Sequence, residues 1–149
     1  MTKTAIFDPG LTTGAVLHNT LPGPYFGGKL EFYHIDCTKL LTFCNWLRYH
    51  QPDKVWYESF HYRPAQKVAE LYSIEVIAIA RLYIETNNLP EPFTCMPVEA
   101  KRFWTDEKIK KLGLWQPGKK HAMDALRVYL TGRQKTEPDW FAAILPDLK

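Results

Sequence analysis

The sequence predicts an α/β fold in which a mixed five-stranded sheet is flanked by helices. Three apolar runs near the start are joined by turn-rich segments, as in antiparallel neighbours. Two further strand-like runs alternate with helical patterns, which is typical of parallel crossovers. The composition, 46% hydrophobic and 23% charged over 149 residues, is that of a globular protein. We expect one domain over residues 1–149, with residues 133–149 as a C-terminal tail that packs on the body.

The elements follow from local patterns. Asp8-Pro9-Gly10 interrupts the first apolar run, and the Pro- and Gly-rich residues 19–28 form a loop before the third. Apolar spacing of three and four residues predicts helices, and Gly132 is expected to end the last one. The expected strands are 3–8, 13–18, 29–35, 54–59 and 93–97, and the expected helices are 37–50, 64–88, 98–104, 107–112 and 119–131.

The predicted helix 64–88 is apolar over most of its circumference. A helix with this pattern must be buried on two sides. In a chain of this size a partner subunit can supply the second side, so the pattern is compatible with a homodimer formed through this helix.

Two acidic residues end apolar strands. Asp8 closes the first strand, and Glu58 closes the run Val55-Trp56-Tyr57. If these strands are parallel neighbours, their ends lie about 5 Å apart, and the two carboxylates repel each other. A divalent cation removes this repulsion, and a site with only oxygen ligands favours Mg²⁺ or Mn²⁺.

A third motif, His121-x-x-Asp124, lies on the last predicted helix, where this spacing puts both side chains on one face. Together with Asp8 and Glu58 it fits hydrolysis of a phosphodiester with two metal ions. In that scheme Asp8 bridges both ions, Glu58 and Asp124 each hold one, and His121 binds metal or moves a proton. Taken singly, each motif is more typical of an ordinary turn or a surface pair.

The positive charge is concentrated in the last third of the chain. The net charge is +3, and residues 101–149 carry 11 basic and 6 acidic side chains. Such clustering is typical of proteins that bind a phosphate backbone, although a solvated helix face can show it too. The candidates for phosphate contacts are Lys101, Arg102, Lys119 and Lys120.

The stretch Ile6–Gly14, the strand ending in Glu58, and His121-Ala-Met-Asp124-Ala resemble the RuvC-like Holliday junction resolvases of the RNase H-like (retroviral integrase) superfamily. The three motifs occur in the family's order, and the short chain is similar to compact phage-encoded members. The resemblance implies a Mg²⁺-dependent endonuclease that cuts four-way DNA junctions as a homodimer. It also implies that Asp8, Glu58, His121 and Asp124 form the catalytic, metal-binding set.

The loop after Glu58 mixes aromatic and basic side chains, including Phe60, Tyr62 and Arg63. The resemblance implies that an aromatic residue in this loop stacks on junction bases. Base stacking contributes about 1–3 kcal/mol per base, so Phe60 or Tyr62 could hold a junction open. Alternatively, one of the two rings packs in the core.

Other functions remain open. Residues 8–14 also resemble the first phosphate loop of actin-like sugar kinases, which need two such domains. A non-catalytic junction-binding module, or a nuclease of the same superfamily that acts on other branched DNA or on RNA–DNA hybrids, fits the same fold. No run approaches the roughly 20 apolar residues of a membrane helix, and the first residues lack a signal-peptide core. We therefore expect a cytoplasmic protein, and the resemblance implies a bacterium or the host of a phage.

Overall fold

The computed structural model of the chain describes residues 1–21, 26–60 and 71–149. It contains the predicted mixed sheet, with strand order β3-β2-β1-β4-β5. The first three strands pair antiparallel, and β4 pairs parallel with both β1 and β5. The strands are β1 (Thr2–Asp8), β2 (Thr12–Thr20), β3 (Gly28–Asp36), β4 (Lys54–Glu58) and β5 (Thr94–Cys95).

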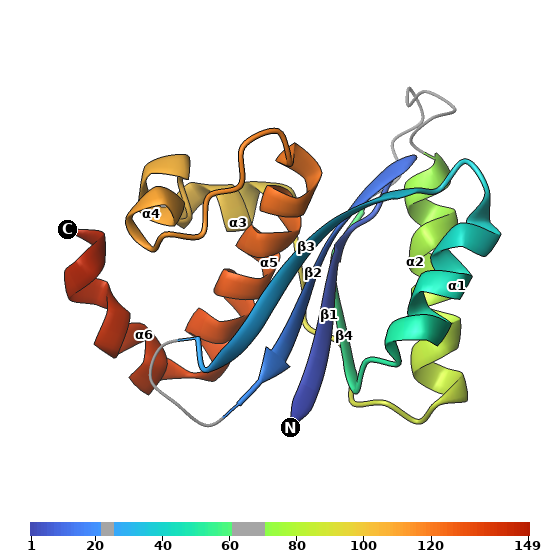
Figure 1. The fold of residues 1–149 in the computed structure, drawn as a ribbon, viewed down its shortest axis with the longest axis horizontal. Helices are drawn as coiled ribbons and strands as arrows, with labels where there is room; N and C mark the ends of the chain where they lie inside the picture. The colour runs from blue at the N-terminus through green and yellow to red at the C-terminus, as the bar shows by residue number, and fades with distance from the viewer. Residues whose placement is uncertain (22–25, 61–70) are drawn as a thin grey trace.

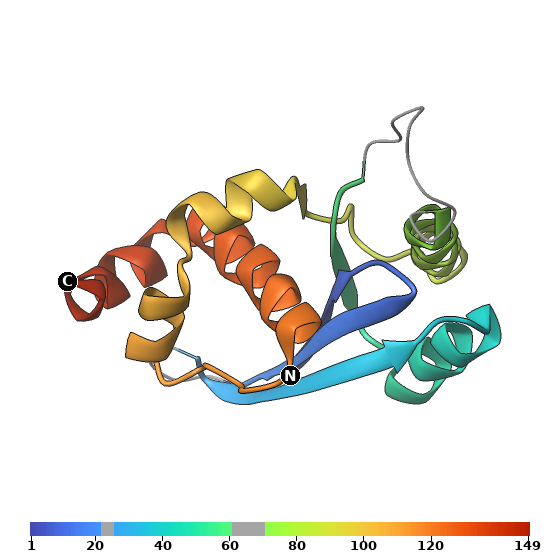
Figure 2. The same cartoon turned by 90° about the horizontal axis from the view of Figure 1, so that it is seen from above.

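Helices cover both faces of the sheet (Figure 1). Helices α1 (Leu40–His50) and α2 (Leu71–Thr86) lie on one face, and α5 (Lys120–Thr136) lies across the other. Seen from above, the remaining helices surround the outer side of α5 (Figure 2). They are α3 (Pro97–Phe103), α4 (Asp106–Lys111) and α6 (Pro138–Ile144), followed by a 3₁₀ turn, Leu145–Leu148. Within the described ranges, none of the helices is both long and apolar enough to span a membrane.

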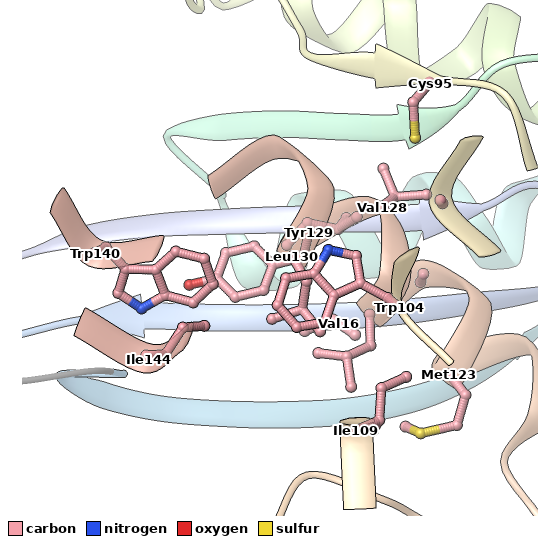
Figure 3. Close-up of a cluster of buried hydrophobic side chains, with 14 of the residues drawn as sticks. Val16, Cys95, Trp104, Ile109, Met123, Val128, Tyr129, Leu130, Trp140 and Ile144 are labelled. Carbon is pink, nitrogen blue, oxygen red and sulfur yellow. The ribbon is translucent and has the colours of Figure 1, made fainter. Parts of the chain in front are cut away.

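Alternation along β1 divides the core into two clusters. Ala5 and Phe7 pack toward α1 and α2, whereas Ile6 between them packs toward α5. The cluster on the α5 side contains the fully buried Trp104 and the largely buried Trp140 (Figure 3). Because both faces of the central strand are covered, the position of each helix over the sheet is set by packing.

The predicted end of the last helix at Gly132 is wrong, because α5 continues to Thr136. Residues 133–136 therefore belong to the helix and not to a tail. A Cβ atom at Gly132 would lie 2.6 Å from the ring of Trp56, so the glycine permits close packing of the helix on β4. The predicted strand 93–97 is also too long, because Pro97 begins α3, a position that suits proline.

A second glycine contact fixes the start of α5 against the sheet. A Cβ atom at Gly14 of β2 would lie 1.9 Å from the carbonyl oxygen of His121. No side chain fits in this space, so only glycine lets the first turn of the helix reach the strand. This contact places His121 over the end of β1, since Gly14 pairs with Asp8.

We predict that Gly14→Ala destabilises the protein by about 3 kcal/mol or more, because the added methyl group forces α5 away from β2. Thermal and urea unfolding measure the change. Gly10→Ala is the matched control, since its Cβ would meet Thr12 O at 3.5 Å and Ser73 Oγ at 3.9 Å, which are ordinary contacts. Equal stability of the two variants would contradict the close approach of helix and strand.

Candidate active site

The parallel pairing of β1 and β4 brings two strand-end carboxylates to one edge of the sheet. Phe7 pairs with Tyr57, so Asp8 and Glu58 are the next residues along neighbouring strands. The chain beyond Glu58 is fixed by a hydrogen bond from the Ser59 amide to the Cys95 carbonyl at 2.8 Å. The parallel adjacency on which the sequence argument for these two acids depends is therefore present in the structure.

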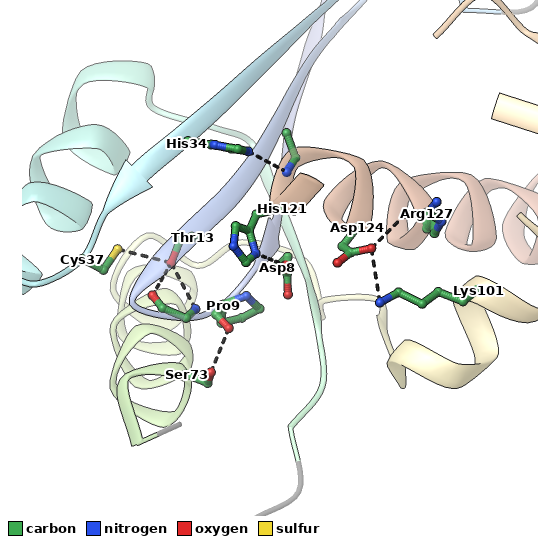
Figure 4. A network of polar contacts seen from close by, with 12 residues as sticks. Asp8, Pro9, Thr13, His34, Cys37, Ser73, Lys101, His121, Asp124 and Arg127 are labelled. Carbon is green, nitrogen blue, oxygen red and sulfur yellow. Dashed lines mark hydrogen bonds and ion pairs between the residues drawn. The ribbon is translucent and has the colours of Figure 1, made fainter. Parts of the chain in front are cut away.

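The turn after Asp8 is fixed by side chains from two other elements. Thr13 Oγ1 accepts a hydrogen bond from the Gly10 amide at 3.2 Å and donates one to the Gly10 carbonyl at 2.9 Å. Ser73 of α2 donates to the Pro9 carbonyl at 2.8 Å (Figure 4). Because the turn is held from both sides, the backbone that carries Asp8 has a defined direction.

Helix α5 brings the other two predicted groups to this edge. His121 Nδ1 lies 3.2 Å from Asp8 Oδ2 (Figure 4). Asp124 lies one turn further along the helix, and its side chain is only 10% exposed. Two cations contact Asp124 Oδ1, namely Arg127 Nη1 at 2.8 Å and Lys101 Nζ at 3.4 Å.

Arg127 is the buried centre of this charge network. It contacts Asp124, donates from Nε to the Trp104 carbonyl at 2.9 Å, and forms an ion pair with Asp106. The fixed fork of a guanidinium group can donate to several acceptors at once. Arg127 therefore links the Asp124 carboxylate to the end of α3 and the start of α4.

The carboxylates destabilise one another's charged forms. Burial, followed by the charges of Asp8 and Asp124, raises the pKa of Glu58 to about 8. Burial and the charge of Asp124 also raise the pKa of Asp8, and the contact with His121 partly opposes this rise. A cation placed among these carboxylates would reverse both shifts.

The donor set suits a hard divalent cation, since three carboxylates supply oxygen atoms. No three His, Cys, Asp or Glu side chains of the described residues are gathered as ligands around one point. Asp124 Oδ1 contacts Arg127 and Lys101, and Asp8 Oδ2 contacts His121. The predicted metal set therefore stays a prediction.

A hollow of about 350 Å³ opens beside the carboxylates. Asp8, His121 and Asp124 line it together with Lys101 and Lys120, two of the residues predicted to bind DNA. Among the residues that the structure describes, Glu58 does not contribute to the lining of this hollow. The structure thus places Lys101 and Lys120, two of the four residues predicted to contact phosphate, at the candidate site.

The other predicted DNA-binding residues lie in different settings. Arg102 is exposed on α3, and Lys119 donates from Nζ to the Phe32 carbonyl at 3.2 Å. Phe60 is half-buried just after β4. Tyr62 and Arg63 lie outside the described residues.

Sequence reasoning missed two residues at this site. His34 of β3 pairs with Gly14, and its Nε2 accepts a hydrogen bond from the Ala122 amide at 3.3 Å. Burial and the neighbouring His121 lower the pKa of His34. No local motif marks His34, because only the strand register reveals it. The sequence did contain a signal for the contact of Arg127 with Asp124, since the two residues lie three positions apart on a predicted helix.

Solved structures with a similar fold include RuvC and a viral Holliday junction resolvase. RuvC from Thermus thermophilus matches with a TM-score of 0.63 at 15% identity, over 96% of each chain. The same protein in complex with a Holliday junction substrate matches with a TM-score of 0.62 at 14% identity, over 97% of this chain and 96% of that one. The Holliday junction resolvase of fowlpox virus matches with a TM-score of 0.58 at 15% identity, over 90% of this chain and 99% of that one.

The predicted RuvC-like, RNase H-like fold is thereby confirmed. No protein-family model matches the sequence, and a search of the curated proteins found no match. The similarity is thus one of fold, at low sequence identity.

We predict that Glu58→Gln stabilises the metal-free protein at pH 8 by on the order of 1 kcal/mol, with a smaller effect near pH 5. The folded-state pKa of about 8 exceeds the ordinary 4.5, so the folded protein holds a proton that the unfolded chain releases. Stability therefore falls as pH rises from 4.5 through 8, and glutamine removes that loss. Thermal unfolding in EDTA at several pH values measures the stability difference between the variant and the wild-type protein. Glu75→Gln, on the exposed side of α2, is the control. A pH-independent difference would contradict the assigned cause.

Proposed function

We propose that the protein is a metal-dependent endonuclease that cuts branched DNA, above all four-way junctions, by a two-metal-ion mechanism. One observation supports the proposal most directly: Asp8 of β1, Glu58 of β4 and Asp124 of α5 lie near enough for their charges to interact. His121 contacts Asp8, and Lys101 contacts Asp124. The structural neighbours, which are Holliday junction resolvases, support this choice of substrate.

In the proposed site Asp8, Glu58 and Asp124 hold Mg²⁺ or Mn²⁺. When bound, the cations stabilise negative charge at the phosphate and lower the pKa of water. His121, oriented by its contact with Asp8, binds metal or moves a proton. Lys101 and Lys120 at the hollow attract the DNA backbone, and Lys101 gains a phosphate as a partner when it leaves Asp124.

An exposed apolar stripe on α2 supports the proposed homodimer. Leu71, Ile74, Ala78 and Leu82 follow one another at helical spacing, and all four are exposed. Leu82 alone is 64% exposed, whereas Val76, Ala80 and Ile84 on the inner side are buried. A second copy of the helix would cover this stripe, and each subunit would then cut one strand of a junction.

We predict that Asp8→Asn retains junction binding but lowers the cleavage rate by about two to three orders of magnitude, because it removes a charge that holds the cations. Labelled four-way junction, linear duplex and RNA–DNA hybrid are incubated with protein in Mg²⁺ and in EDTA. Symmetric nicks in the junction alone, dependent on Mg²⁺, are the expected wild-type result.

Asp139→Asn, at an exposed acid on α6, is the matched control and should cut at the wild-type rate. Wild-type cutting by Asp8→Asn would refute the metal assignment. Equal cutting of all three substrates by the wild-type protein would refute selectivity for branched DNA.

We predict that Ile74→Glu converts the dimer to a monomer, because it places a charge in the centre of the apolar stripe. Sedimentation equilibrium measures the mass against concentration. Leu41→Glu, at a residue of α1 that is 62% exposed, should leave the association unchanged. A wild-type protein that stays monomeric at high micromolar concentration would contradict the proposed dimer.

A further inference from the structure

A second hollow lies next to the candidate active site, and it is formed by the end of α3, the start of α4, the loop before α5 and the first turns of α5. Its volume is about 620 Å³, within the range of about 300–1,000 Å³ typical of small-molecule sites. Both hollows are lined by Lys101, Lys120 and Asp124, so they share a rim. We propose that this second hollow is a nucleotide subsite, in which an unpaired base next to the cut phosphate stacks on Trp115.

Trp115 forms one wall of the hollow and is only half-buried. Its loop is ordered by hydrogen bonds at both ends, from the Leu114 amide to the Ile109 carbonyl at 3.2 Å and from the Lys119 amide to the Gln116 carbonyl at 3.3 Å. The indole itself packs against the core cluster on the α5 side, so it loses little entropy when a ring stacks on it. Stacking on an aromatic side chain is tolerant of base identity, because every base has a π face.

The charges of this hollow suit a phosphate group beside the base. Lys101, Lys119 and Lys120 lie on its lining. Lys110 is not on the lining, and its ammonium group lies over one face of the Trp115 ring, 4.9 Å from the ring centre, so the base would stack on the other face. Arg127, also on the lining, is already paired with Asp106 and Asp124. Lys101 also contacts Asp124, so Lys119 and Lys120, which form no ion pair with another described residue, supply most of the positive charge of the hollow.

The combination distinguishes a nucleotide from other anionic ligands. An acidic peptide would use the lysines but would gain little from the indole face, whereas a nucleotide uses both. The shared rim then places the nucleotide beside the catalytic carboxylates. The position of the bound nucleotide along the DNA rests on the proposed nuclease function. The stacking itself needs neither metal nor cleavage.

Stacking can be tested in EDTA by fluorescence anisotropy with two labelled six-nucleotide probes. One is oligothymidylate, and the other has the same phosphates with abasic sugars throughout. The wild-type protein is expected to bind the thymidylate roughly 5–150-fold more tightly than the abasic probe. Trp115→Ala should remove most of this preference while leaving the affinity for the abasic probe nearly unchanged, and Trp115→Phe should retain it.

Tyr49→Ala is the matched control, because Tyr49 is an aromatic residue 84% exposed on α1. It should keep the wild-type preference. If Trp115→Ala does not fold, Trp115→Leu retains apolar packing without a ring and takes its place. A wild-type preference in the ring-less variant, or no preference in the wild-type protein, would overturn the subsite. A protein that shows the preference but cuts no junction would instead refute the proposed nuclease function.

Discussion

The approach of α5 to the sheet at Gly14 is the constraint on which the rest of the structure depends. The first turn of this helix lies so close to β2 that a Cβ atom there would be 1.9 Å from the His121 carbonyl oxygen. The contact sets His121 next to Asp8, and the helical rise carries Asp124 one turn onward. Gly132 makes the corresponding contact with Trp56 further along the helix. Two glycines thus fix the height of the helix over the sheet, and with it the geometry of the candidate site.

Crowding of like charges at the strand ends is balanced by basic groups from neighbouring elements. His121 contacts Asp8, while Arg127 and Lys101 contact Asp124. These partners lower the cost of burying carboxylates. Because Arg127 is also tied to Trp104 and Asp106, the orientation of Asp124 depends on α3 and α4 as well as on its own helix.

The features that the sequence predicted well are those with local causes. The strand-end acids and the shared helix face of His121 and Asp124 follow from residue spacing, and the mixed sheet follows from crossover rules. The errors arose where tertiary packing decides. Gly132 has the usual signal of a helix end, yet it serves contact with Trp56, which is distant in sequence. His34 reaches the site only through the register of β3 with β2, which no local pattern encodes.

The convergence of three carboxylates on a divalent cation is the central claim, and anomalous diffraction from crystals soaked in Mn²⁺ tests it most directly. We expect anomalous peaks within coordination distance of Asp8, Glu58 and Asp124, with Lys101 moved away from Asp124. Crystals of Asp8→Asn soaked in the same way should show weaker peaks or none. A manganese peak at another place, or a site with no peak while Asp124 keeps its contacts with Arg127 and Lys101, would contradict the claim.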